Sequence, residues 1–476
     1  MLTAMSSFAW SNDIVRKLLI ANRGEIACRI IRSAQALGIS TVAIYSEADR
    51  DSLHAQMADE AIAVGPAQPT LSYLNMQRIL EAALESGADA VHPGYGFLSE
   101  NAAFAEAVIQ HGLIWVGPAP ETIRQMGDKQ TARGTAAKAD VPVVRGSVRF
   151  KIGELAGVEA AAEKVGFPLL IKAAAGGGGI GMRQADGPDG LAALVASVQA
   201  AAEKSFGNGD VYLERYLPKA RHVEIQVFGL GDGRAVHLFD RDCSLQRRFQ
   251  KVIEEAPAPN LASRVRDRMC EAALSLCRET NYAGAGTVEF IVDAESFEFF
   301  FLEMNTRIQV EHPITEMITG VDLVAMQLKL AAGGTGVTIP HTLETEGCAI
   351  ECRLYAENPA KSFFPSPGRL TIFRLPEPLP GLRVDTGYRE GDMVTPFYDP
   401  LVAKIIAHGK TRAAAVQTAI SALENLTVEG IKTNRSFLLA CLRDESFVAA
   451  DLHTRFLDMH KTRLLAAAEE IERSQT

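Results

Sequence analysis

The sequence is organised around FFFLEMNTRIQVEHP, which occupies residues 299–313. Its first four residues are apolar and are typical of a buried strand. Polar side chains then crowd into ten residues: Glu303, Asn305, Arg307, Gln309, Glu311 and His312. A solvated loop is the plain alternative, but such a loop would be richer in Gly, Ser, Asp and Pro. The stretch therefore predicts a strand followed, from Asn305 on, by a loop that carries function.

Length and composition limit the class of protein. The chain has 476 residues, too many for one hydrophobic core, so about two to four packed units are expected. A net charge of −10 argues against a nucleic-acid-binding protein, which normally carries a basic surface. The seven cysteines include no CxxC pair, which favours free thiols in a reducing compartment over a zinc site or disulfide framework. No apolar run reaches the roughly 18 residues of a membrane helix. We expect a cytoplasmic protein that binds neither nucleic acid nor membrane.

The first third of the chain alternates strands and helices. Strands are predicted at residues 17–21, 39–45, 88–92 and 114–116, with helices between them. This order is typical of a doubly wound parallel sheet. The turn after the first strand holds one glycine instead of GxGxxG, so a nicotinamide-dinucleotide site is not favoured. HPGYGFLSEN, residues 92–101, is either a tight turn or a ligand contact, and Ser99 or Asn101 is a candidate helix cap.

A lysine on an apolar strand precedes a run of glycines. Residues 167–173, FPLLIKA, predict a strand that contains Lys172, and GGGGIG follows at residues 176–181. Glycine amides can approach phosphate oxygens closely, whereas glycine runs are also common linkers. The lysine favours a phosphate-binding flap whose contacts would include Gly177, Gly178 and Gly179.

Two further features complete the predicted nucleotide site. Lys129 lies near a predicted helix start, where a cation needs an anionic partner, although a surface lysine is the alternative. Residues 211–216, VYLERY, predict a strand after a helix at residues 191–202. An adenine ring would fit between this strand and the lysine strand, with the backbone from Glu214 to Leu217 bonding its edge.

Two patterns bring charge toward the site. HVEIQV at residues 222–227 alternates, so His222, Glu224 and Gln226 share one face of a strand; a half-exposed strand explains the pattern equally well. Four cations then fall within eleven residues of an acidic protein, which suggests an anion site, with a solvated charge run as the alternative: Arg241, Arg247, Arg248 and Lys251.

A predicted hairpin brings two carboxylates together. Strands at residues 287–292 and 297–303 are separated by the turn residues 293–296, so Glu289 and Glu303 can share a face. Adjacent carboxylates repel, and a shared divalent cation stabilises both. Oxygen ligands suit Mg²⁺ or Mn²⁺. The alternative is a pair of exposed glutamates.

Together these motifs resemble the biotin carboxylase family of the ATP-grasp superfamily. The resemblance spans residues 17–457 and rests on MGDK, the lysine strand with its glycines, HVEIQ, QRRFQK, EMNTRIQVEHP and ECR at residues 351–353. It implies an α/β protein with a doubly wound amino-terminal domain, an ATP-grasp domain with a mobile glycine-rich lid, and a carboxy-terminal α+β domain. The implied bounds are residues 1–127, 128–345 with the lid at about 143–216, 346–461, and a tail at 462–476.

The resemblance implies a ligase that uses ATP and bicarbonate to carboxylate the biotin of a carrier protein. Lys129, Lys172, His222 and Gln246 would line the ATP site, and Glu289, Glu303 and Asn305 would hold Mg²⁺ or Mn²⁺. Bicarbonate would be positioned by Lys251, Arg307, Gln309 and the backbone of Val310. Glu311 would be the base that deprotonates bicarbonate, and Arg353 would steady the biotin enolate.

The resemblance also implies partners and leaves alternatives. No Met-Lys-Met biotin attachment site occurs, so the biotin carboxyl carrier protein and the carboxyltransferase are expected on separate chains, with a homodimer of this one. Acetyl-CoA is the expected final acceptor; propionyl-CoA, methylcrotonyl-CoA and urea carboxylases are alternatives. Phe249 stands where histidine is usual, and Ala175 and Ile180 replace a glycine and a basic residue of some members. Another ATP-grasp ligase and a catalytically silent ATP-binding homologue are the competing readings.

Overall fold

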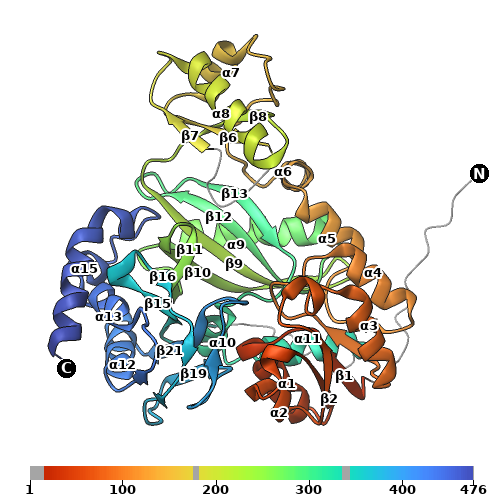
Figure 1. The fold of residues 1–476 in the computed structure, drawn as a ribbon. Coiled ribbons are helices and arrows are strands. Elements are labelled where there is room, and N and C mark those ends of the chain that lie inside the picture. Colours follow the sequence, from red (N-terminus) through yellow and green to blue (C-terminus); the bar gives the residue numbers. More distant parts are fainter. Residues whose placement is uncertain (1–14, 175–181, 335–343, 475–476) are drawn as a thin grey trace, which may run out of the picture.

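The computed structural model describes residues 15–174, 182–334 and 344–474. Within these ranges Figure 1 shows a parallel sheet at the lower right, a large antiparallel sheet through the centre and a small sheet at the top. The α/β class and the three-part architecture predicted from the sequence are confirmed.

The amino-terminal part is a parallel sheet in the order β3-β2-β1-β4-β5, with helices on both sides. The first and fourth strands end together, because Ile20 pairs with His92. Asn22 then donates to the carbonyl oxygens of Pro93 and Tyr95 at 2.7 and 2.8 Å, so HPGYG is a braced turn. Asn101 caps the helix that follows. The elements are β1 (Lys17–Ile20), α1 (Gly24–Ala36), β2 (Ser40–Ser46), α2 (Leu53–Met57), β3 (Glu60–Gly65), α3 (Met76–Glu85), β4 (Ala90–His92), α4 (Ala102–Gln110), β5 (Ile114–Trp115) and α5 (Pro120–Gly127).

The small sheet at the top of Figure 1 belongs to the predicted lid. Its strands run antiparallel in the order β7-β6-β8 and pack with two helices around a hydrophobic core of their own. Ala175, Gly177, Gly178, Gly179 and Ile180 lie outside the described residues. The elements are α6 (Lys129–Lys138), which leads into the lid, α7 (Val158–Val165), β6 (Leu169–Ala173), β7 (Met182–Ala185), α8 (Leu191–Phe206) and β8 (Val211–Arg215).

The central sheet is antiparallel and has the order β13-β12-β9-β10-β11-β14-β21-β19. Strand β9 lies inside it and is buried on both faces, so the half-exposed alternative is wrong. Its valine and isoleucine side chains join a core with α9, whereas Glu224 and Gln226 face the opposite side toward α10. The elements are β9 (Ala220–Leu230), β10 (Ala235–Arg247), β11 (Gln250–Ala256), α9 (Ser263–Glu279), β12 (Ala283–Asp293), β13 (Phe299–Asn305), α10 (His312–Thr319) and α11 (Leu323–Ala331).

The carboxy-terminal part continues the same sheet. Ile253 of β11 pairs with Cys352 of β14, so the predicted boundary at residue 345 falls between strands of one sheet. The predicted tail is helical as far as Ser474, and Leu464 and Ala468 are buried. The elements are β14 (Cys348–Tyr355), β15 (Glu357–Asn358), β16 (Phe364–Pro365), β17 (Gly368–Arg369), β18 (Ile372–Arg374), β19 (Leu382–Thr386), β20 (Met393–Val394), β21 (Leu401–Gly409), α12 (Arg412–Glu424), β22 (Thr427–Glu429), α13 (Arg435–Arg443), α14 (Glu445–Val448) and α15 (Phe456–Ser474).

The cysteines lie mostly in the interior of the protein. All seven cysteines are free, and only Cys348 among them is not fully buried. In the part of the chain that the structure describes, no helix combines the length and the apolar character needed to cross a membrane.

Candidate active site

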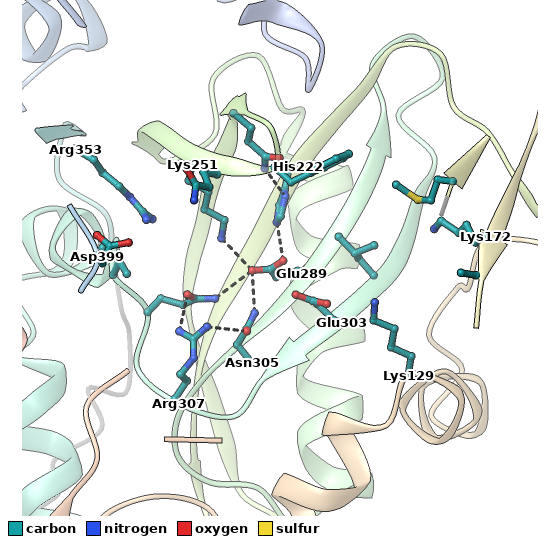
Figure 2. Close-up of a pocket in the computed structure, with 18 of the residues that line it drawn as sticks. Lys129, Lys172, His222, Lys251, Glu289, Glu303, Asn305, Arg307, Arg353 and Asp399 are labelled. Atoms are coloured by element: carbon teal, nitrogen blue, oxygen red, sulfur yellow. Dashed lines mark hydrogen bonds and ion pairs between the residues drawn. The ribbon is translucent and has the colours of Figure 1, made fainter. Parts of the chain in front are cut away.

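A cleft of about 550 Å³ lies where the lid, the central sheet and the loop after β13 meet. Figure 2 shows Lys172 on one side of it and Arg353 with Asp399 on the other. The structure brings most of the predicted site residues into its wall: Lys129, Lys172, His222, Gln246, Lys251, Glu289, Glu303, Asn305, Arg307, Gln309, Val310 and Arg353. Glu214, Leu217 and Glu311 are not among its lining residues.

The predicted carboxylate pair lies on neighbouring strands at the centre of the cleft. Glu289 of β12 is directly opposite Glu303 of β13, as the hairpin predicted. Burial raises the pKa of Glu303, and the charge of Glu289 raises it further. Glu289 is buried and Glu303 is partly buried, and each opposes the ionisation of the other. Together they form an oxygen donor set to which a divalent cation would add the missing positive charge.

Glu289 is the more strongly ionised member of the pair. Burial alone would raise its pKa, but Lys251 and His222 hold it well below its usual range. His222 Nε2 lies 2.9 Å from Glu289 Oε2, and Gln246 lies 2.8 Å from the other ring nitrogen of His222. Although burial lowers the pKa of His222, Glu289 raises it above its ordinary value.

Lys251 is the cation at the centre of the site. Its Nζ lies 2.7 Å from Glu224 Oε2, 3.0 Å from Glu289 Oε1 and 2.6 Å from Glu311 Oε1. Burial lowers its pKa, but Cys243 and the three carboxylates raise it well above its usual value. Lys251 is therefore a protonated ammonium that lines the cleft, where it can bind an incoming anion.

The loop from Asn305 onward turns polar side chains back into the cleft, as Figure 2 shows. Arg307 donates to Asn305 Oδ1 at 3.1 Å and to Gln309 Oε1 at 3.0 Å. Asn305 and Gln309 in turn donate to Glu289 Oε1 at 2.9 and 3.1 Å. On its outer side Arg307 donates to Glu100 at 2.9 Å, so the HPGYGFLSEN stretch supports this loop. The sequence did not predict that link.

Glu311 is completely buried and bound on both sides. Lys251 donates to its Oε1, and Arg353 of β14 donates to its Oε2 at 2.9 Å. Burial would raise the pKa of Glu311, but Lys251 and Arg353 hold it well below its usual range. Arg353 Nε also lies 2.5 Å from Glu254, whose pKa burial raises to about 7 against the effect of that guanidinium. Glu311 is thus an ionised carboxylate behind the wall of the cleft.

The lid lysine has a protein partner. Lys172 donates to Glu214, and Arg133 of α6 donates to the same carboxylate. Glu214 therefore contributes its side chain to Lys172, where the sequence predicted only its backbone. Leu217 follows β8 and is partly exposed outside the cleft. At the other end of the carboxylate pair, Figure 2 shows Lys129 reaching toward Glu303.

Several lining residues were not predicted. Met182 and Tyr212 lie directly opposite Lys172 on the two neighbouring strands of the lid, and Leu302 lines the cleft from β13. They form an apolar surface of the kind that suits a planar base. Tyr212 and Leu302 lie within predicted strands and Met182 follows the glycine run, but nothing in the sequence marked their side chains as lining the cleft. Ala173, Phe249, Gln250, Tyr355 and Asp399 complete the wall.

Family models cover nearly the whole chain. The biotin carboxylase N-terminal domain matches residues 14–123, the ATP-binding domain of the carbamoyl-phosphate synthase L chain matches 128–337, and the biotin carboxylase C-terminal domain matches 351–459.

Individual proteins match over the same length. Biotin carboxylase 1 of Bacillus subtilis is 48% identical over 94% of this chain and 99% of that protein. The mitochondrial methylcrotonoyl-CoA carboxylase subunit alpha of Dictyostelium discoideum is 47% identical, over 95% of this chain and 64% of that longer protein. Among solved structures, the biotin carboxylase domain dimer of Hydrogenobacter thermophilus 2-oxoglutarate carboxylase, in complex with MgADP, ADP and bicarbonate, has a TM-score of 0.87 and 41% identity over 95% of this chain and 99% of that one.

Proposed function

Because the chain belongs to the biotin carboxylase family, whose members are ATP-dependent ligases, we propose that it uses ATP and bicarbonate to carboxylate the biotin of a carrier protein through carboxyphosphate. The observation that carries the proposal is the convergence on one cleft of the Glu289 and Glu303 carboxylates, Lys251 and the Arg307 loop. Glu311 lies directly behind it, 2.6 Å from Lys251.

The ATP end of the cleft is the end next to the lid. Lys129 and Lys172 would neutralise phosphate oxygens, with Lys172 exchanging Glu214 for phosphate, and His222 and Gln246 would line the same region. Glu289, Glu303 and Asn305 would hold Mg²⁺, or Mn²⁺ in its place, since their oxygens form a donor set suited to a hard cation. When bound, the ion would neutralise charge on the phosphates during transfer.

Bicarbonate is a poor nucleophile and needs both a cationic site and a base. Lys251, Arg307 and Gln309 line one region of the cleft with the backbone of Val310, and together they would hold the anion. An anion bound there competes with Glu311 for the charge of Lys251. Losing that partner would raise the pKa of Glu311 and make it a stronger base for the bicarbonate proton.

Phosphoryl transfer and carboxylation would then follow in one enclosed space. A bicarbonate oxygen attacks the γ-phosphorus, the bond to ADP breaks, and carboxyphosphate forms. Carboxyphosphate splits into CO₂ and phosphate, the phosphate takes the proton of the biotin ureido nitrogen, and that nitrogen attacks CO₂. Arg353, at the far side from the lid, would stabilise the negative charge on the ureido oxygen.

An ATPase assay with free biotin tests the reaction. Phosphate release should require bicarbonate and rise with biotin. Turnover that is indifferent to biotin would favour another ATP-grasp ligase, and nucleotide binding without turnover would identify a silent homologue; either result contradicts the proposal.

For the complete system we propose an acyl-CoA carboxylase, with acetyl-CoA as its acceptor and with carrier and carboxyltransferase as separate chains that join a homodimer of this one. The 99% coverage of Bacillus subtilis biotin carboxylase 1 supports the separate chains. Matches to methylcrotonoyl-CoA and 2-oxoglutarate carboxylases name the competing acceptors. Purification with the biotinylated partner, its mass, and acceptor-dependent product formation decide between them.

A further inference from the structure

Lys404 of β21 is a buried lysine that the proposed chemistry does not use. Its side chain is 0% exposed. The ammonium donates to the carbonyl oxygen of Val310 at 2.8 Å and lies 3.0 Å from Glu25 Oε1 and 3.9 Å from Asp385 Oδ2. A buried ammonium is costly unless anionic and polar groups surround it, so these contacts fix its position.

The carbonyl group that Lys404 binds belongs to the peptide bond between two residues of the proposed site. This peptide joins Val310, the proposed bicarbonate contact, to Glu311, the proposed base. Glu311 is also the residue immediately before α10. One hydrogen bond therefore holds the orientation of the peptide between the two functional residues.

The two carboxylates around Lys404 come from the amino-terminal part and from the carboxy-terminal part itself. Glu25 lies in the first turn of α1 and accepts a hydrogen bond from Tyr95, whereas Asp385 of β19 is held by Arg383 at 2.6 Å. Within the sheet Lys404 is directly opposite Asp385 on one side and Arg353 on the other. Through Lys404, the loop that contains Val310 is held in a fixed position relative to β14, the strand that carries Arg353.

We propose that Lys404 is a positioning residue for bicarbonate activation: its ammonium, anchored by Glu25 and Asp385, holds the Val310–Glu311 peptide so that the anion and its base keep a fixed relation. The inference rests on the proposed function. A displacement of about 1 Å in such a peptide costs on the order of 100-fold in rate, although Lys404 touches no substrate.

The experiment compares the wild type with Lys404→Met, with the charge-balanced variant K404M/E25Q, and with Glu25→Gln as the matched control that keeps the donor. The double variant leaves neither a lone cation nor a lone Glu25 carboxylate, so it should retain cooperative thermal unfolding where K404M alone loses it. In the double variant kcat/KM for bicarbonate should fall at least about tenfold, while the Kd for ATP stays within about twofold. E25Q weakens one anchor of the ammonium but keeps the donor to Val310, so its kcat/KM for bicarbonate should fall clearly less than that of the double variant.

Hydrogen exchange supplies a readout besides activity. Peptides that cover residues 305–316 should exchange faster in K404M/E25Q than in E25Q. Unchanged exchange and unchanged kcat/KM in the folded double variant would overturn the inference, as would an equal loss in E25Q. A wild type without bicarbonate-dependent turnover would instead overturn the proposed function, and the exchange data would still decide whether Lys404 holds the loop.

Discussion

Lys251 is the residue on which the charge balance of the cleft depends. Three carboxylates lie within 3.0 Å of its ammonium, and all of them are buried. Arg241 neutralises part of the negative charge of Glu224, because its Nε donates to that carboxylate at 2.6 Å. Any anion that enters the cleft therefore rearranges an existing network of ion pairs, and the carboxylate released from Lys251 gains basicity.

Glu311→Gln tests whether the carboxylate that an anion releases from Lys251 acts as the base. The amide keeps the shape of the side chain but cannot take a proton, so bicarbonate-dependent turnover should fall by roughly 100- to 10,000-fold. The Kd for ATP, measured by calorimetry, should stay within about twofold. Glu298→Gln, at an exposed position just before β13, is the matched control. Full activity in E311Q would remove Glu311 as the base.

Phe249 stands where the resemblance to biotin carboxylases implied a histidine. It is 63% exposed and lines the cleft from the two-residue turn between β10 and β11, where Arg248 and Phe249 both have positive φ. A phenyl ring cannot donate to a phosphate oxygen, whereas histidine can, and histidine tolerates this backbone conformation. Phe249→His should therefore tighten ATP binding by about 1 kcal/mol in calorimetric titrations.

Phe249→Leu separates hydrogen bonding from shape, since leucine also lacks a donor and should leave the affinity for ATP unchanged. Equal affinities for F249H and F249L would show that position 249 does not reach the phosphates.

The sequence predicted residues that lie in the cleft better than residues that support it. The EMNTRIQVEHP stretch places five of its residues in the wall, four of them polar, because polar residues after a buried strand have few other roles. Arg241 was assigned to an anion site, yet it is fully buried against Glu224, Gln226 and Thr287. Only the folded structure reveals that Glu224 already neutralises the charge of Arg241.

At the scale of elements, β10 shows how partners override local pattern. The strand runs from Ala235 to Arg247, straight through the charged residues that follow Phe239. Its charged residues are buried because each has a partner: Asp240 binds Arg266, and Asp242 binds Arg221 at 2.7 Å. A run of charged residues argues against a buried strand when only the sequence is known. In the folded protein such residues can lie in a buried strand, because ion pairs neutralise them.

The junction between α1 and the strand β19 is packed without room for a side-chain carbon. A Cβ on Gly387 would lie 2.5 Å from the carbonyl carbon of Gly24. Gly387→Ala should lower the free energy of unfolding by about 1–3 kcal/mol, measured by urea denaturation, because backbone would have to move.

Gly134→Ala is the control for the glycine substitution itself. Gly134 is in α6, and a Cβ there meets nothing within 4 Å, so the change should stabilise the helix by up to about 1 kcal/mol. If G387A were as harmless as G134A, the tight contact between the amino-terminal and carboxy-terminal parts would be wrong.

At the scale of the whole molecule, ion pairs join all three parts around α10. Arg29 of α1 and Arg383 of β19 both donate to Glu316 of α10, at 2.8 and 2.7 Å. Lys404 and Asp385 lie next to them. The loop that follows β13 thus leads into a helix that is fixed from both sides, and activity should depend on this arrangement as well as on the cleft.

Acid titration of Asp385 tests the arrangement. Burial would raise its pKa, but Arg383 and Lys404 lower the pKa to about 2, below the 3.8 of an unperturbed aspartate. A lowered folded-state pKa gives stability that is complete above the unfolded value and is lost as pH falls from about 4 to about 2. Asp385→Asn should cost about 2 kcal/mol of unfolding free energy at pH 5–7, and the gap should narrow below about pH 4. A gap that is constant or widens on acidification would contradict the assignment.

The sequence could not reveal that one sheet runs through both the ATP-grasp part and the carboxy-terminal part of the molecule. Strand β11 pairs with β14 through Ile253 and Cys352, which are about a hundred residues apart, and no local pattern encodes such a pairing. The amino-terminal sheet was predictable because its strands alternate with helices over short distances. The bounds of the domains accordingly stay predictions.

The oxygen atoms of bicarbonate show directly whether bicarbonate attacks ATP in this cleft. If the anion in the Lys251 and Arg307 region attacks the γ-phosphorus, one oxygen must pass from bicarbonate into the phosphate released. With ¹⁸O-labelled bicarbonate, ATP and biotin, mass spectrometry of phosphate after short reaction times should find one ¹⁸O atom per phosphate. Phosphate that carries oxygen from water instead would contradict the account.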